Sequence, residues 1–302
     1  MKSYDAGPIS PPILEETIGA NFERIVEANP DGEALVDVIR GRRWTYAELN
    51  AEIDLIARGL MSLGVQRGDR VGVWSPNCAE WTMVQYATAK IGAVLVNINP
   101  AYRTHELGYA LNQSGVRTLV TATAFKSSDY RSMVEEVRPS AGGLRDVVFL
   151  GTDDWTGLRD RADLVPVDAL RSRMAALDNR EPINIQYTSG TTGFPKGATL
   201  SHRNILNNGY FATELLNLGP KDRLCIPVPF YHCFGMVMGN LAATTHGSCM
   251  VIPAPSFHPA ATLRAVSDER CTSLYGVPTM WIAELELADF AAYDLTSLRT
   301  GI

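Results

Sequence analysis

The feature that most constrains the fold of this 302-residue chain is an alternation of short apolar runs with segments of helical period. Runs rich in Val, Ile and Leu recur between segments whose apolar residues are spaced three or four apart. Strands separated by helices in this way indicate βαβ units and a mostly parallel sheet. We therefore expect an α/β protein. The expected strands cover residues 71–74, 94–98, 118–120, 147–150, 183–187, 224–226, 249–252, 273–275 and the start of another at 298–302.

The helical segments fill most of the intervals between these runs. Thr45 and Glu48 have the spacing of a capping box, and Gly64 suits the end of the helix that follows. Apolar residues at helical spacing from Ile13 predict an earlier helix that stops near Asn29. Residues 151–180 are polar, without a clear period, and are expected to form an irregular connection. The other expected helices cover residues 79–91, 105–113, 129–137, 202–216, 235–245, 259–268 and 278–287.

Because the α/β rhythm restarts after residue 180, we expect two βαβ-type subdomains, 13–180 and 181–302.

The net charge of −6 argues against nucleic acid as a partner, because nucleic-acid binding usually needs a basic protein surface. Residues 224–263 contain no Asp, Glu, Lys or Arg, but prolines and polar residues interrupt them, so buried core or an acyl-binding wall is favoured over a transmembrane segment. Five scattered cysteines suggest neither disulfides nor a metal site and favour a cytoplasmic location.

Residues 188–197, here called the phosphate loop, combine hydroxyl residues, three glycines and one lysine. Glycines let backbone N–H groups approach phosphate oxygens, hydroxyls add donors, and the lysine adds positive charge. The loop is not a Walker motif, because Lys196 is followed by Gly197 rather than Ser or Thr, and a strand is expected to follow. A plain surface turn is the alternative. The candidate phosphate contacts are Thr188, Ser189, Gly190, Thr191, Thr192, Gly193 and Lys196.

The string from Tyr187 to Gly197 resembles the signature of the adenylate-forming superfamily, which includes acyl-CoA synthetases, luciferases and peptide-synthetase adenylation domains. Residues 43–49, 90–103, 229–235 and 275–279 resemble further motifs of that superfamily, so the resemblance covers essentially the whole chain. It is greatest to the medium-chain fatty acyl-CoA synthetases.

The resemblance implies an ATP-dependent fatty acid–CoA ligase. A carboxylate attacks the α-phosphorus of ATP to give acyl-adenylate and pyrophosphate, and the thiol of coenzyme A then displaces AMP. Because the first step brings two anions together, charge neutralisation and positioning must supply most of the catalysis, and Mg²⁺ is expected to share the phosphate charge. No metal ligand is assigned in this chain. The implied catalytic residues are Thr191, Lys196 and His232, and the implied acyl contacts are His232, Tyr275 and Val277.

Each of these assignments has a plainer alternative. His232 lies among aromatic residues and would otherwise be a packed histidine, while Tyr275 and Val277 would otherwise be core residues. His202 follows Ser201, a suitable helix cap, and is expected to begin a helix rather than take part in catalysis.

The same resemblance implies downstream parts that this sequence does not contain: an adenine-binding loop, a Tyr/Thr-Glu motif, a ribose-binding Asp, and a small C-terminal domain with a catalytic lysine. We therefore expect residues 1–302 to be a partial AMP-binding N-terminal domain, truncated before its end, with the small C-terminal domain absent and no activity alone. The alternative is a non-catalytic truncated polypeptide with at most weak phosphate or acyl binding.

Overall fold

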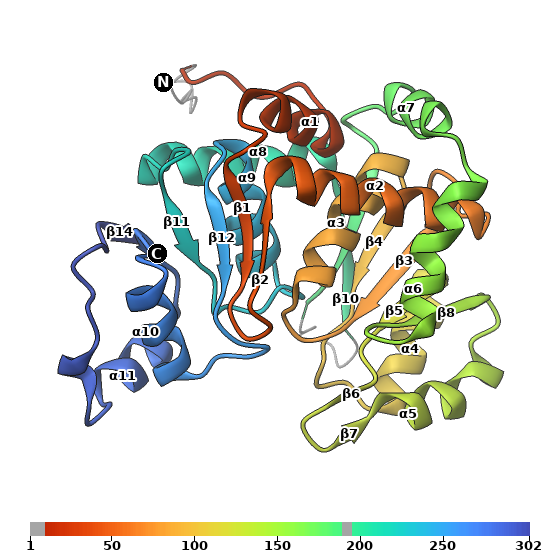
Figure 1. Ribbon diagram of the computed structural model, residues 1–302. Helices are drawn as coiled ribbons and strands as arrows, with labels where there is room; N and C mark the ends of the chain where they lie inside the picture. Colours follow the sequence, from red (N-terminus) through yellow and green to blue (C-terminus); the bar gives the residue numbers. More distant parts are fainter. Residues whose placement is uncertain (1–9, 189–194) are drawn as a thin grey trace, which may run out of the picture.

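Two six-stranded sheets organise the protein in the computed structural model, which describes residues 10–188 and 195–302 (Figure 1). Sheet A contains β1 (Glu33–Asp37), β2 (Arg42–Thr45), β11 (Arg223–Cys225), β12 (Cys249–Ile252), β13 (Ser273–Leu274) and β14 (Thr300–Gly301). Sheet B contains β3 (Arg70–Trp74), β4 (Val94–Asn97), β5 (Val116–Thr121), β8 (Asp146–Phe149), β9 (Pro182–Thr188) and β10 (Lys196–Ser201). A small hairpin is formed by β6 (Ala124–Phe125) and β7 (Ser128–Asp129).

The strand order is β14-β13-β11-β12-β1-β2 in sheet A and β10-β9-β4-β3-β5-β8 in sheet B. Neighbouring strands are parallel except for β1–β2 and β9–β10, the antiparallel pair at one edge of each sheet. The expected α/β class with mostly parallel sheets is confirmed. Each sheet draws strands from both sequence ranges expected to be subdomains, since β1 pairs with β12 and β4 pairs with β9. The subdomain limits 13–180 and 181–302 thus do not coincide with the two sheets, and they remain a proposal.

Helices cover both faces of both sheets, because successive strand residues point to opposite sides and both sides are apolar. The helices are α1 (Ile18–Ala28), α2 (Tyr46–Ser62), α3 (Ala79–Ile91), α4 (Thr104–Ser114), α5 (Tyr130–Val137), α6 (Asp153–Asp160), α7 (Val167–Ala175), α8 (His202–Leu216), α9 (Ala242–Thr245), α10 (Pro259–Asp268) and α11 (Pro278–Leu285). A π-helix, η3 (Phe234–Leu241), precedes α9, and 3₁₀ turns lie at Arg138–Ser140, Arg161–Leu164 and Phe290–Ala292.

Three apolar cores result from this layering. The largest lies between the sheets, where α1, α2, α3, α8 and η3 pack against residues such as Leu95 and Met250. The next residue of each strand points away from it: Val96 packs under α4 and α5, and Val251 packs with residues of α10. In Figure 1, α10 and α11 flank sheet A, whereas α4 and α5 flank sheet B. The chain thus forms alternating helix and sheet layers.

Several sequence-based boundaries hold and others do not. The capping box of α2 is confirmed: the Thr45 hydroxyl accepts from the Glu48 amide, and the Glu48 carboxylate accepts from the Thr45 amide. The earlier helix is predicted from Ile13 but begins at Ile18, because the backbone N–H and C=O of Leu14 bond the side-chain amide of Asn207 in α8 instead of a helical partner. Residues 151–180, predicted to be irregular, contain α6 and α7. The β1–β2 pair was not predicted.

Residues 224–263 contain most of β11, all of η3, α9 and β12 and the start of α10, and they supply much of the buried core. Within the described residues, the structure has no helix that combines the length and apolarity needed to cross a lipid bilayer.

Candidate functional site

The phosphate loop lies in sequence between β9 and β10, and β10 is the edge strand of sheet B. Strands β9 and β10 are antiparallel, with Thr188 directly opposite Lys196. Both side chains are exposed at the base of the loop. Of the other candidate phosphate contacts, Ser189, Gly190, Thr191, Thr192 and Gly193 lie outside the described residues. The strand expected after Lys196 is confirmed as β10.

Helix α4 holds both flanks of this loop. The hydroxyl of Tyr109 donates to the carbonyl of Pro195 at 3.1 Å, and the hydroxyl of Tyr187 donates to the carbonyl of Ala110 at 3.2 Å. Two consecutive residues of one helix therefore fix the strand that enters the loop and the segment that leaves it. In the described part of the chain, no ion pair involves Lys196.

The segment that carries His232 runs from β11 in sheet A to the carboxyl end of sheet B. Asn77, which follows β3, donates from its side chain to the Val228 carbonyl at 2.9 Å and accepts from the Phe230 amide at 2.8 Å. These two bonds hold the segment as a neighbouring strand would. The carbonyl of Tyr231 accepts from the side chains of Asn97, the last residue of β4, and Gln186, two residues before the end of β9.

The turn around His232 is tight. A Cβ atom at Gly235 would lie 2.3 Å from the carbonyl oxygen of Pro229, which is shorter than any ordinary contact, so the turn requires glycine there. His232 is exposed, and its Nδ1 accepts from the Phe234 amide at 3.1 Å. The Cys233 sulfur lies 3.7 Å from the same nitrogen. This contact raises the pKa of His232 and lowers the pKa of the Cys233 thiol.

Tyr275 lies directly after β13 and is fully buried. Its ring stacks on Phe234, with the ring centroids 5.5 Å apart. Burial raises the pKa of the Tyr275 hydroxyl, which has no hydrogen-bond partner within the described residues. Val277, the N-cap of α11, is 39% exposed. Both candidate acyl residues therefore lie at the carboxyl end of sheet A, and Tyr275 is connected to His232 through Phe234.

The carboxyl ends of the two sheets meet at these loops. In parallel α/β sheets, ligands bind outside the carboxyl ends of strands. A cavity of ≈ 190 Å³ lies there, beside Tyr231, and its lining includes Asn77, Asn99, Pro229 and Phe257. Thr188, Lys196, His232 and Tyr275 are thus brought to one end of the molecule from β9, β10, the β11–η3 segment and β13.

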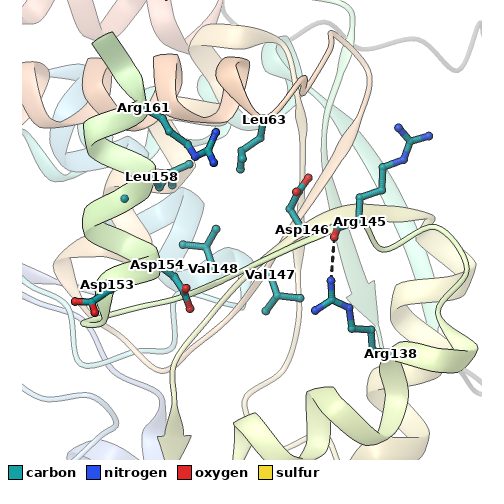
Figure 2. A pocket seen from close by; sticks show the side chains of 11 residues that line it. Leu63, Arg138, Arg145, Asp146, Val147, Val148, Asp153, Asp154, Leu158 and Arg161 are labelled. Carbon is teal, nitrogen blue, oxygen red and sulfur yellow. Dashed lines mark hydrogen bonds between the residues drawn. The ribbon is translucent and has the colours of Figure 1, made fainter. Parts of the chain in front are cut away.

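A second hollow, of ≈ 400 Å³, lies along β8 and α6 (Figure 2). Three arginines and three aspartates line it, and Arg138 donates to the Arg145 carbonyl at 3.2 Å. None of the candidate residues that the structure describes lines this hollow. It also does not border the segment that carries His232, as the smaller cavity does through Pro229 and Tyr231, so we do not include it in the site.

The sequence reasoning missed the amides that hold the His232 segment. Asn97, Asn184 and Gln186 lie in strands that were predicted correctly, yet they were not singled out. The available signal was their position in the sequence. Asn184 and Gln186 are two residues apart and therefore share one face of a buried strand, where a side-chain amide needs a hydrogen-bond partner.

His202 begins α8 as predicted, and the Ser201 hydroxyl caps that helix. The imidazole is buried, and its Nδ1 accepts from the Ile18 amide at 3.2 Å. Desolvation lowers the pKa of His202 to about 4. Its role is therefore to join α1 to α8.

Comparison with known proteins identifies relatives along the whole chain. YngI of Bacillus subtilis, classed as an acyl-CoA synthetase, is 42% identical over 309 residues, which cover 96% of this chain and 56% of YngI. The mitochondrial medium-chain acyl-CoA ligase ACSF2 of Danio rerio is 40% identical over 320 residues, which cover 99% of this chain and 53% of the ligase. This chain spans about half the length of these curated relatives.

A solved structure shows the same fold. The N-terminal domain of FACL13 from Mycobacterium tuberculosis superposes with a TM-score of 0.81 at 24% identity, over 95% of this chain and 69% of that chain. The model of the AMP-binding enzyme family matches residues 22–302. The resemblance carried by the phosphate loop is thereby confirmed, and the chain belongs to the AMP-binding enzyme family.

Proposed function

We propose that this chain is the N-terminal part of an ATP-dependent fatty acid–CoA ligase, which forms an acyl-adenylate and then transfers the acyl group to coenzyme A. The names of the relatives support this assignment. The observation that carries it is geometric. The base of the phosphate loop and the His232 segment emerge at the same end of the molecule and are tied together through the Tyr231 carbonyl.

The proposed roles follow from charge. The proposed contacts of the β- and γ-phosphates are the ammonium of Lys196, the hydroxyl of Thr188 and the loop residues Ser189 to Gly193. Thr191 and Lys196 stabilise the charge that develops as pyrophosphate leaves. His232, whose pKa is raised by Cys233, binds the substrate carboxylate as a hydrogen-bond donor. Tyr275 and Val277 line the acyl chain beyond it.

ATP, the fatty acid and coenzyme A are the proposed small-molecule partners. Mg²⁺ accompanies ATP as the counter-ion of its phosphates. Among the described residues, no group of three or more His, Cys, Asp or Glu side chains is arranged to hold a metal ion, so we assign Mg²⁺ no ligand here. All five cysteines are free thiols and four are buried, which supports the proposed reducing, cytoplasmic location.

The test is ATP–pyrophosphate exchange, which reports adenylate formation, measured on the protein at its full natural length with fatty acids from butyrate to palmitate. Lys196→Ala should lower exchange about 100-fold, because it removes a charge aimed at the leaving phosphates. Lys221→Ala is the matched control, since Lys221 is exposed near the start of β11, and it should leave exchange unchanged. Exchange by Lys196→Ala within about threefold of wild type would refute the role of this lysine. If the wild-type protein shows no acid-dependent exchange, the non-catalytic alternative is favoured.

A further inference from the structure

The segment carrying His232 is fastened to the strand carrying Thr188 by a chain of buried amides. Gln186 Nε2 donates to the Tyr231 carbonyl at 2.8 Å, and Asn97 Nδ2 donates to the same oxygen at 3.1 Å. Asn97 Nδ2 also reaches Gln186 Oε1 at 3.0 Å, and Asn97 Oδ1 accepts from Asn184 at 2.9 Å. The three amides therefore run head to tail and end on one carbonyl oxygen.

Water has little access to these bonds. The exposed fraction is 1% for Asn97, 1% for Asn184 and 6% for Gln186. In such surroundings an amide–carbonyl bond is stronger than in water, and an amide that loses its partner is costly to leave buried. The network therefore ties the Tyr231 carbonyl to β4 and β9.

Two members of the network, Gln186 and Tyr231, are close in sequence to the two halves of the candidate site. Gln186 is two residues before Thr188 on β9, whose register places Lys196 opposite. Tyr231 is bonded directly to His232. A displacement of the Tyr231 carbonyl from Gln186 would therefore displace His232 relative to the base of the phosphate loop.

We propose that Gln186 is a positioning residue: it fixes His232, which binds the substrate carboxylate, relative to the base of the phosphate loop, which binds ATP. This inference rests on the proposed ligase function. Adenylate formation needs the carboxylate oxygen aligned on the α-phosphorus, and a misplacement of about 1 Å can cost about 100-fold in rate. Gln186 touches neither reactant, and its contribution is the distance between the groups that do.

The test compares two buried glutamines that each donate to a backbone carbonyl. Gln186→Met removes the bond to Tyr231 while keeping the side-chain volume. Gln85→Met is the matched control: Gln85 is buried on α3 and donates to the Met236 carbonyl in η3 at 3.2 Å, and within the described residues it has no hydrogen bond to β9. Each variant loses two side-chain hydrogen bonds: Gln186 is bonded to Tyr231 and Asn97, and Gln85 is bonded to Met236 and Asn240. The structural cost is therefore similar. Kinetics are measured per folded molecule at the full natural length of the protein.

We expect Gln186→Met to lower kcat for adenylate formation at least about tenfold, with KM for ATP and for octanoate changed less than about threefold. Gln85→Met should keep kcat within about twofold. If both variants lower kcat equally, or if Gln186→Met changes KM alone, the positioning role is wrong.

A second readout needs no turnover. Inorganic pyrophosphate is added, and the ring Cε1–H resonance of His232, assigned with a His232→Gln variant, is followed by NMR. Pyrophosphate should shift this resonance in the wild-type protein and in Gln85→Met, and the shift should fall by more than about half in Gln186→Met. A shift that is unchanged in Gln186→Met would overturn the link and leave the ligase assignment intact. Absence of exchange together with a Gln186-dependent shift would refute the ligase and leave the link standing.

Discussion

Mild acid should destabilise this protein through His202, because the folded state keeps that imidazole neutral. The side chain is 1% exposed, its Nδ1 accepts from the Ile18 amide, and its Nε2 has no partner within the described residues. A protonated imidazole at this buried position would lose its hydration, and its Nδ1 could no longer accept the hydrogen bond from Ile18. Desolvation accordingly lowers the pKa of His202 to about 4 from an ordinary value of 6.5, and the nearby Asp178 opposes the shift only in part.

The sign and size of the effect follow from proton linkage. The unfolded chain protonates His202 at higher pH than the folded protein does, so protons favour unfolding. The contribution of neutral His202 is fully present above pH 6.5 and is lost as pH falls toward 4. Between pH 7 and pH 5, the free energy of unfolding should fall by about 2 kcal/mol from this group alone.

The measurement is urea denaturation at pH 7 and pH 5 for the wild-type protein and for His202→Gln. The glutamine amide oxygen can accept from the Ile18 amide but does not titrate, so the loss on acidification should be about 2 kcal/mol smaller than in the wild type. His105→Gln, at an exposed position on α4, controls for the change itself and should behave like the wild type. Carboxylates with lowered pKa values affect all three proteins alike. Equal losses in the wild type and His202→Gln would refute the reasoning.

Two further changes test the packing around α2 and α3. The Lys90 side chain is fully buried, and its ammonium bonds Glu23, Asp54 and Asn50. Lys90→Met leaves these acceptors facing one another and should lower the free energy of unfolding by about 3 kcal/mol, whereas Lys221→Met should not change it. A loss below about 1 kcal/mol in Lys90→Met would show that the ammonium is dispensable. Thr45→Ala should lower the free energy of unfolding by about 1 kcal/mol, with most of it restored in Thr45→Ser. Identical denaturation midpoints for Thr45→Ala and the wild type would contradict the capping argument.

Local signals were sufficient for most of the fold. The capping box at Thr45 and the apolar runs of β3, β4 and β12 are encoded within a few residues, and each was located from those residues alone. Helices α6 and α7 were missed because few of their residues are buried, mainly Trp155, Leu158 and Leu170, so they lack a continuous apolar stripe.

The missing parts depend on contacts between distant segments. Strand β1 is five residues long, and its partner β12 lies on the other side of the whole of sheet B in the sequence. The role of the Asn97 and Gln186 amides can be recognised only when their common partner, the Tyr231 carbonyl, is known. The candidate phosphate contacts, by contrast, come from one short signature and were named in advance, although their roles remain proposals.

The pairing of β1 with β12 also determines when sheet A can form during translation. The Tyr46 hydroxyl that follows β2 donates to the Ser248 carbonyl, a partner 202 residues later in the chain. At about 5–20 residues per second, a ribosome delivers that partner about 10–40 s after β1 and β2 have been made. Sheet B can form in the meantime, since its last strand ends at Ser201. During synthesis, the edge of β1 that later pairs with β12 therefore stays unpaired until β12 has been made. We expect nascent chains to depend most on chaperones during that interval.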